Sequence, residues 1–156
     1  MRRACGLFKF SKGHTLTTFD DIRSDFELLD DWEDRYRYVI ELGRTLPEMP
    51  AALKTDATKV RGCASQVWLA SRRKGAASAP VLHFDGDSDA HIVRGLVAIL
   101  LILVQDRPAG EIATLDLEGR FASLGLRDHL TPQRSNGLAS MVARIKADAK
   151  AALSAA

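Results

Sequence analysis

Residues 65–73, SQVWLASRR, and residues 81–86, VLHFDG, carry the strand pattern from which the fold class follows. In both stretches apolar side chains alternate with polar or small ones, which is typical of a β-strand with one buried face. The residues between them, KGAASAP at 74–80, are mostly small and include a glycine and a proline, so they predict a turn or short loop. We expect the two strands to pair as an antiparallel hairpin over about residues 65–86.

Helical patterns surround this hairpin, because apolar residues recur there at three- and four-residue spacing. The predicted helices cover residues 18–29, about 31–45, 89–105, 117–124 and 132–152. The expected N-caps are Thr18, Asp30 or Asp31, Asp87 or Ser88, and Thr131. Residues 46–58 contain two prolines and predict a loop, and residues 59–61 are expected to add a third short strand.

Together these elements predict an α+β fold, in which a small antiparallel sheet of about three strands packs against several helices. Residues 18–156 show no internal repeat or linker and are expected to form a single domain. Residues 1–17 precede the first helical pattern and are expected to be a disordered N-terminal extension.

The composition excludes several classes of protein. Of the 156 residues, 46% are apolar and 27% are charged, so collagen, coiled-coil and disordered chains fit poorly. Four of the 22 basic residues lie within residues 1–14, which contain no acid. The remainder is therefore slightly acidic, and we do not expect it to bind nucleic acid. The apolar run at residues 92–104 has 13 residues and includes Arg94, which falls short of the roughly 20 needed to span a membrane.

The cysteines and histidines also limit the chemistry. Two cysteines that form no CxxC pair favour a reduced, cytoplasmic protein over one with a disulfide framework. The four histidines show no ligand spacing with each other or with a cysteine, and no glycine-rich phosphate loop is present. We therefore expect no metal and no cofactor bound to this chain.

Reactive chemistry concentrates in one segment, VRGCASQVW at residues 60–68. Cys63 follows a glycine and comes directly before a predicted strand, among polar and small neighbours. A cysteine thiolate becomes more available when positive charge stabilises it, and Lys59 and Arg61 supply that charge. Gly62 permits backbone angles that other residues avoid. From these residues alone, Cys63 is either a nucleophile or an inert, partly buried thiol.

Four blocks of the chain resemble the SufE family of sulfur acceptors. The blocks are, in the family's order, DWEDRYRYVIELGRTLP at 31–47, RGCASQVW at 61–68, GDSDAHIVRGL at 86–96 and HLTPQRSNGL at 129–138. The resemblance covers about residues 18–150. It implies an α+β fold like that of iron–sulfur scaffold proteins, with helices packed on a small antiparallel sheet.

The resemblance also implies a function. Cys63 would accept sulfur as a persulfide from a SufS-type cysteine desulfurase, whose activity the acceptor stimulates, and would pass that sulfur to a downstream iron–sulfur scaffold complex. The pyridoxal phosphate of this reaction belongs to the desulfurase. The protein itself would be a covalent carrier rather than an enzyme, and we expect a cytoplasmic monomer or weak dimer.

Further site residues follow from the same blocks. Arg134 matches a family arginine near the cysteine, where it would stabilise a thiolate or contact the partner; a surface arginine on a helix is the alternative. Asp89 matches an aspartate associated with the resting position of the cysteine loop, and its alternative is a carboxylate in the first turn of a helix, stabilised by the helix dipole. Ser65 and Gln66 are expected to form hydrogen bonds within the loop, whereas Trp68 is expected in the core.

Two features depart from the family's pattern. Cys5 lies in the extension MRRACGLFKFSKGHTL, which the resemblance does not cover, and has no motif around it. Ala122 occupies a position at which other members carry an acid. If that acid gates the cysteine loop elsewhere in the family, gating here relies on another contact.

Two other functions remain open at this point. A cysteine-dependent hydrolase would need a histidine base within hydrogen-bond reach of Cys63, with His83, His91 and His129 as the candidates. An iron–sulfur cluster scaffold usually needs several thiolates, and only Cys63 lies in the predicted domain. The rim that meets a partner is expected to include Asp56, Arg61 and Arg134.

Overall fold

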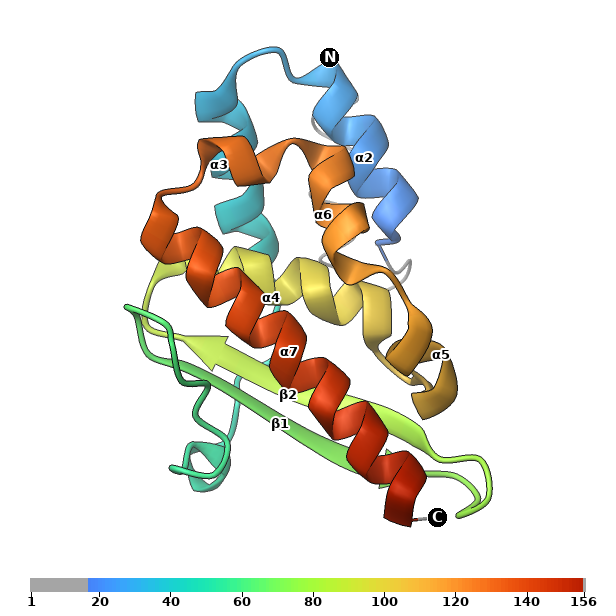
Figure 1. The fold of residues 1–156 in the computed structure, drawn as a ribbon. Helices are drawn as coiled ribbons and strands as arrows, with labels where there is room; N and C mark the ends of the chain where they lie inside the picture. The colour runs from blue at the N-terminus through green and yellow to red at the C-terminus, as the bar shows by residue number, and fades with distance from the viewer. Residues whose placement is uncertain (1–16, 156) are drawn as a thin grey trace.

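The computed structural model describes residues 17–155 (Figure 1). The elements in chain order are α2 (Phe19–Leu28), α3 (Trp32–Gly43), η2 (Ala51–Leu53), β1 (Val67–Lys74), β2 (Val81–Ser88), α4 (His91–Val104), β3 (Arg107–Pro108), α5 (Ala109–Thr114), α6 (Leu117–Leu124), η3 (Leu126–His129) and α7 (Pro132–Ala155). The frame is a three-stranded sheet with the two longest helices, α4 and α7. The predicted α+β fold with a small antiparallel sheet is confirmed.

The sheet has the order β1-β2-β3 and is antiparallel throughout. The hairpin predicted from the alternating pattern is present, with Val67 opposite Ser88 and Lys74 opposite Val81. The predicted position of the third strand is wrong. Residues 59–61 contribute only an isolated bridge between Lys59 and Trp68, whereas β3 pairs with the start of β2.

The buried side chains of the hairpin follow the predicted alternation. Val67, Leu69, Leu82 and Phe84 are all almost fully buried. Helix α4 packs against β2, and a Cβ atom at Gly86 would lie only 2.7 Å from the Cγ1 atom of Val97 on α4. Because α4 is buried along nearly its whole length, its sequence is apolar on every side. No helix within residues 17–155 is both long and apolar enough to cross a membrane.

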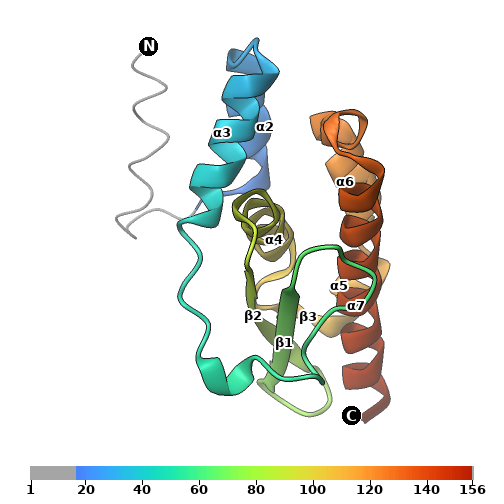
Figure 2. The ribbon, with the colours of Figure 1, turned by 90° about the vertical axis from the view of Figure 1, so that its left-hand side faces the viewer.

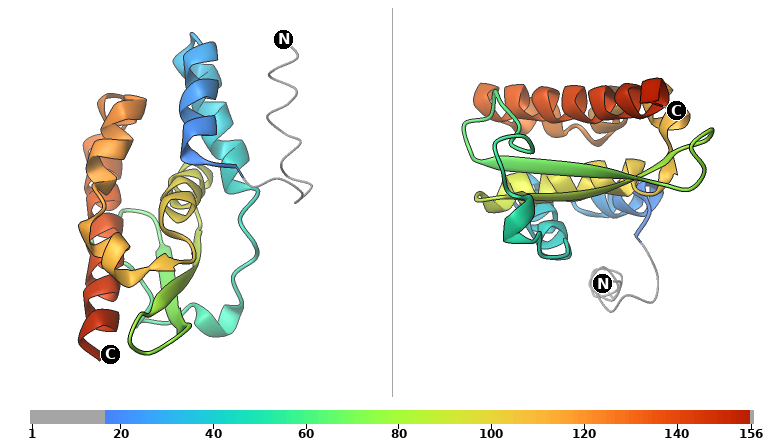
Figure 3. Two further views of the ribbon diagram at one scale, coloured as in Figure 1. Left: turned by 90° about the vertical axis from the view of Figure 1, so that its right-hand side faces the viewer. Right: turned by 90° about the horizontal axis from the view of Figure 1, so that it is seen from below.

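Helix α7 lies on the opposite face of the hairpin from α4 and runs along the strands (Figure 3). Its apolar residues Leu138, Met141, Val142 and Ile145 are buried, as the sequence predicts. Helices α3 and α4 cross so closely that a Cβ atom at Gly95 would collide with the carbonyl group of Val39.

Most predicted helix ends are confirmed by their caps. Thr18 and Asp21 form a reciprocal capping box at α2, and Asp31 accepts a hydrogen bond at the start of α3. Gly125 adopts a left-handed conformation with φ of 73° at the end of α6. The Oγ1 atom of Thr131 accepts a hydrogen bond in the first turn of α7.

Two boundaries differ from the prediction. Helix α4 begins at His91 rather than at 89, because β2 continues through Ser88 and uses Asp87 as a strand residue. The Oγ atom of Ser88 accepts a hydrogen bond from the N–H of Ala90 at 3.2 Å, so Ser88 shapes the turn before the helix without being its N-cap. Helix α3 ends at Gly43, before the last residues that the sequence assigned to it.

The predicted loop at residues 46–58 contains the short helix η2 and runs beside the sheet before it turns towards α7 (Figure 2). Lys54 fixes it to the sheet, with its Nζ atom 2.6 Å from Oδ2 of Asp87 and 5.0 Å from the ring centre of Trp68. Trp68 is therefore half-buried beneath a lysine and is not part of the core, contrary to the prediction.

Candidate functional site

Residues 61–66, which we call the cysteine loop, form a closed loop directly before β1. The N–H of Val60 donates to the carbonyl of Val67 at 2.8 Å, and the N–H of Leu69 donates to the carbonyl of Thr58 at the same distance. These bonds fasten the base of the loop to the first residues of the strand. Residues 61–66, which lie between these bonded positions, do not belong to the strand pairing.

The tip of the cysteine loop rests on helix α7, as the path of the chain in Figure 2 shows. The Sγ atom of Cys63 lies 3.6 Å from the carbonyl oxygen of Gly137, to which its thiol donates. A Cβ atom at Gly137 would lie 3.3 Å from that sulfur. Gly62 has φ of +87°, and a Cβ atom there would lie 2.6 Å from Oγ of Ser140. Glycines at both positions therefore permit the close seating of the thiol.

A pocket of about 170 Å³ opens beside the cysteine. Helix α4, helix α7 and the cysteine loop contribute its walls. The lining residues are Cys63, Ala64, Ser65, Val93, Leu96, Thr131, Gln133, Arg134, Gly137 and Met141. The thiol therefore faces a mixed surface, apolar towards α4 and polar towards the first turn of α7.

The environment of Cys63 favours its neutral form. Partial burial raises the pKa of the thiol above its usual value, because the thiolate loses hydration there. The hydrogen bond to the Gly137 carbonyl acts in the same direction, since only the protonated sulfur can donate it. In this position the cysteine is a weak nucleophile.

Asp89 braces the end of the loop, where the sequence resemblance placed it. Its Oδ1 atom accepts a hydrogen bond from the N–H of Gln66 at 3.1 Å, and its own N–H donates to the Gln66 carbonyl at 3.2 Å. Gln66 thus forms these hydrogen bonds through its backbone, and it is exposed to solvent. Asp89 lies between β2 and α4 and outside the helix, so the alternative of a carboxylate within the first helical turn is wrong.

The positive charges around the site differ in position. Arg134 lines the pocket from the first turn of α7, beside Thr131, so its charge adds to the positive end of that helix. Arg61 is exposed next to Gly62 on the cysteine loop. Arg134 is therefore placed to meet a negatively charged group in the pocket beside Cys63.

Several residues at the pocket were not singled out as site residues from the sequence. Val93 and Leu96 of α4, and Gly137, Ser140 and Met141 of α7, contact or line the site. Their three- and four-residue spacing could have placed each set on one helix face. Only the tertiary structure shows that these faces meet the cysteine loop.

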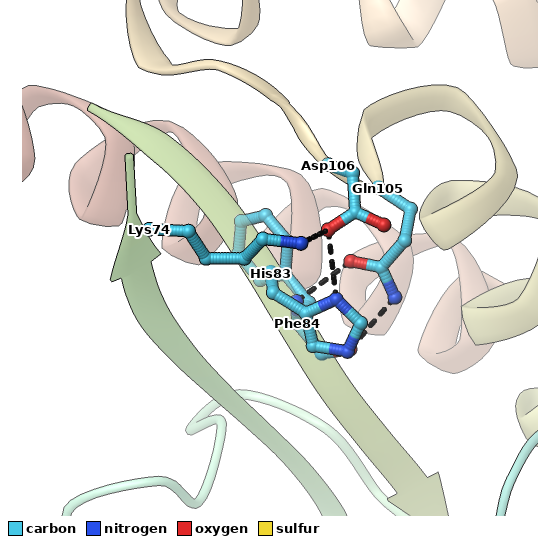
Figure 4. Close-up of polar contacts among 5 residues, drawn as sticks. All are labelled: Lys74, His83, Phe84, Gln105 and Asp106. Atoms are coloured by element: carbon cyan, nitrogen blue, oxygen red, sulfur yellow. Dashed lines mark hydrogen bonds and ion pairs between the residues drawn. The ribbon is translucent and has the colours of Figure 1, made fainter. Parts of the chain in front are cut away.

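The histidines do not meet the requirement of a hydrolase. None of His83, His91 and His129, the histidines of the described chain, lines the pocket. His83 instead bonds through Nδ1 to Asp106 at 2.9 Å, in a separate polar cluster with Lys74 (Figure 4).

The side chains that could ligate a metal ion do not cluster in the described part of the chain. Within residues 17–155, no three His, Cys, Asp or Glu side chains gather as metal ligands, and Cys63 is the one free cysteine. Cys5 and the predicted extension lie, except for Thr17, outside the described residues. Ala122 is exposed on α6 and does not line the pocket.

Comparisons with known proteins identify the family of the chain. The model of the SufE family, described as an Fe-S metabolism associated domain, matches residues 20–149. An uncharacterized SufE-like protein of Rhizobium meliloti is 54% identical over 140 residues, which are 90% of this chain and 100% of that protein. Another, of Rhizobium etli, is 56% identical over 135 residues, or 86% of this chain and 91% of that protein.

A solved structure supports the fold. The solution structure of a hypothetical protein from Thermus thermophilus matches with a TM-score of 0.69 and 18% sequence identity. The match covers 87% of this chain and 96% of the other. The family match supports a role in iron–sulfur metabolism.

Proposed function

The chain belongs to the SufE family, and we propose that Cys63 accepts sulfur from the persulfide of a SufS-type cysteine desulfurase and carries it to iron–sulfur cluster assembly. The observation that carries the proposal is the position of Cys63, at the tip of a closed loop and beside a pocket. A carrier needs a thiol that another protein can reach and that is protected between transfers.

The transfer is an exchange between sulfur atoms. The thiolate of Cys63 attacks the outer sulfur of the desulfurase persulfide, a bond forms between Cys63 Sγ and that sulfur, and the original S–S bond breaks. The desulfurase cysteine leaves as a thiolate, and Cys63 holds the persulfide. No external oxidant or reductant is consumed. The protein thus acts as a carrier and activator, and pyridoxal phosphate serves on the partner.

The cysteine loop must move for this reaction. Cys63 is half-buried and protonated at rest, so neither its reach nor its charge suits attack on another protein's sulfur. The base of the loop stays bonded to β1, while the tip swings out about Gly62 when the bonds to Asp89 and Gly137 break. Outside the pocket, the thiol regains water and its pKa falls.

Arg134 and Arg61 have separate roles in this proposal. Arg134 stabilises negative charge on sulfur that returns to the pocket, since it lines that pocket with Cys63. Arg61 is exposed on the loop and contacts the partner's surface as the loop enters its active site. After loading, a downstream iron–sulfur scaffold complex receives the sulfur.

The test is the mass of the intact protein after incubation with a SufS-type desulfurase and L-cysteine. We expect a product heavier by one sulfur atom, which a reducing agent removes. The product should form with the wild type and with Cys5→Ser but not with Cys63→Ser. No added sulfur on the wild type, from a desulfurase that is active alone and indifferent to this protein, would contradict the proposal.

A further inference from the structure

One face of α7 runs beneath the cysteine loop and the segment that leads into it. Gly137, Ser140, Arg144 and Asp148 follow one another at spacings of three or four residues, which places them on this face. The first two meet the loop tip at Cys63 and Gly62. Arg144 and Asp148 lie farther along the helix, and Arg144 meets the segment upstream of the loop.

Arg144 joins α7 to that upstream segment. Its Nη2 atom donates to the carbonyl oxygen of Ala57 at 2.7 Å, and its Nε atom lies 3.3 Å from Oδ1 of Asp148. The bond is exposed to solvent, so its strength comes from the charge on the guanidinium rather than from burial. The contact thus holds α7 and the segment upstream of the cysteine loop at a fixed separation.

Asp148 orients the arginine. Its side chain is 19% exposed, and its second oxygen, Oδ2, is buried and accepts no hydrogen bond from the rest of residues 17–155. A buried carboxylate oxygen without a hydrogen-bond partner lowers stability unless a nearby positive charge compensates it. Its partner is Arg144, whose side chain is 26% exposed. The pair therefore stiffens the guanidinium that binds Ala57.

We propose that Arg144 is a positioning residue that keeps the cysteine loop seated on α7 and thereby sets how often Cys63 leaves its pocket. The seat of the thiol, the Gly137 carbonyl, belongs to the same helix that Arg144 ties to the loop's upstream arm. When this tie opens, the segment upstream of the loop is no longer held on α7, and the seat of the thiol is weakened. The inference rests on the proposed function only in that sulfur transfer gives the movement its purpose.

The rate at which iodoacetamide alkylates Cys63 tests this directly, without a desulfurase. The Cys5→Ser background leaves one thiol in the chain. Arg144→Met should raise the rate about tenfold, the factor that loss of one charge-assisted hydrogen bond gives. Arg144→Lys keeps a donor and should restore most of the wild-type rate. Asp148→Asn should fall between them.

The matched control is Arg73→Met. The Nη1 atom of Arg73 donates to the carbonyl of Ala152 at 3.3 Å, so the same kind of bond joins β1 to α7 at the far end of the helix. This variant should lose stability to urea as Arg144→Met does, yet leave the alkylation rate of Cys63 unchanged. Equal rises in both variants would show general loosening and overturn the proposal.

The pH profile of alkylation also bears on the proposal. Below the midpoint of the pH profile, a higher frequency of loop opening multiplies the alkylation rate by one factor, and because the thiol ionises more readily outside its seat, the midpoint moves to lower pH as well. Arg144→Met alkylated at the wild-type rate below the midpoint would refute the positioning role. Because sulfur loading is not measured, this failure is distinct from failure of the proposed function.

Discussion

The first half of β2 and the turn that follows its second half are both braced by hydrogen bonds between a side chain and the backbone, and the two braces differ in burial. In the first half, the Gln105 side chain accepts from the N–H of Phe84 at 2.7 Å and donates to its carbonyl at 2.8 Å (Figure 4). The N–H of Asp106 donates to the carbonyl of Leu82 at 2.9 Å. Several bonds, partly buried, act on one short stretch of strand.

Beyond the second half, the bonds of Asp89 to Gln66 are exposed and hold a loop rather than a strand. Water can replace an exposed hydrogen bond at little cost, whereas a buried group that loses its partner remains unsatisfied. The comparison teaches that polar bracing fixes an edge where the bonds are buried and permits opening where they are exposed. The cysteine loop occupies the second kind of place.

The largest expected effect lies at the fixed half. Gln105→Leu removes both hydrogen bonds to the backbone of Phe84. The N–H and the carbonyl group of Phe84 are then left beside the core without these partners. We expect the free energy of unfolding to fall by about 3 kcal/mol, as measured by urea denaturation. The native-state alkylation rate of Cys63 should stay within about twofold of wild type, because the two halves open independently.

A loss below about 1 kcal/mol would show that water replaces the Gln105 side chain readily. A rise in Cys63 alkylation under native conditions would couple the two halves and break the comparison. Gln105→Glu serves as the control, since it keeps the acceptor for the N–H of Phe84 and loses the donor, and should give an intermediate loss.

The next effect concerns the exposed brace. Asp89→Ala removes the acceptor for the N–H of Gln66, and we expect alkylation of Cys63 to rise about fivefold while stability falls by less than about 1 kcal/mol. Asp89→Asn keeps an oxygen at the same position and should remain close to wild type. An alanine variant with an unchanged alkylation rate would show that other contacts, such as Cys63 to Gly137, hold the loop alone.

The sequence predicted the hairpin because its alternation and its turn are local properties. The third strand could not be placed in this way. Residues 107 and 108 include a proline and have no strand pattern, and they pair with β2 only because the end of α4 delivers them there. Residues 59–61 lie close to β1 but make a single bridge. The local pattern favoured a strand there, whereas the tertiary structure places the third strand at residues 107 and 108.

The site divides in the same manner. Cys63, Asp89 and Arg134 were placed by motif resemblance, and the structure brings all three to one end of the sheet and α7. The seat of the thiol could not be predicted, because Gly137 contacts Cys63 across 74 residues of sequence. Its pattern on α7 is that of an ordinary helix face. Long-range packing, not local spacing, selects which face meets the loop.

A smaller effect is expected at Asp106, whose φ of 56° lies in the left-handed region. Asparagine tolerates this conformation, so Asp106→Asn removes the charge without adding strain. Since the carboxylate is 46% exposed, its ion pair with Lys74 and its hydrogen bond with His83 should contribute no more than about 1 kcal/mol. Urea denaturation at neutral pH measures the difference.

The pH dependence of this difference has a definite sign. Hydrogen bonds from Lys74 and then His83 hold the pKa of Asp106 below its usual value. The contribution of the carboxylate is therefore fully present above pH about 4, the usual value in an unfolded chain, and is lost as the pH falls through the lower folded pKa. The gap between wild type and Asp106→Asn should close in acid. A gap that persists there would assign it to packing.

The smallest effect should come from Cys63 itself. Because burial raises the pKa of its thiol, the unfolded chain loses the proton first as the pH rises. The stability that the buried neutral thiol contributes is fully present below pH about 8.5 and is lost between that value and the higher folded pKa. We expect a decline of a few tenths of a kcal/mol between pH about 8 and pH about 10, beyond that of Cys63→Ser, in the Cys5→Ser background.

Equal slopes for the two variants would mean that the thiol meets water as freely in the folded protein as in the unfolded chain, and the resting seat would then not protect it. A steeper decline in the protein with Cys63 ties the protonated sulfur to the seated loop, because ionisation then favours release. The exposed brace at Asp89 would thus hold a loop whose own cysteine becomes both more accessible and more nucleophilic on leaving, which is the property that a sulfur acceptor needs.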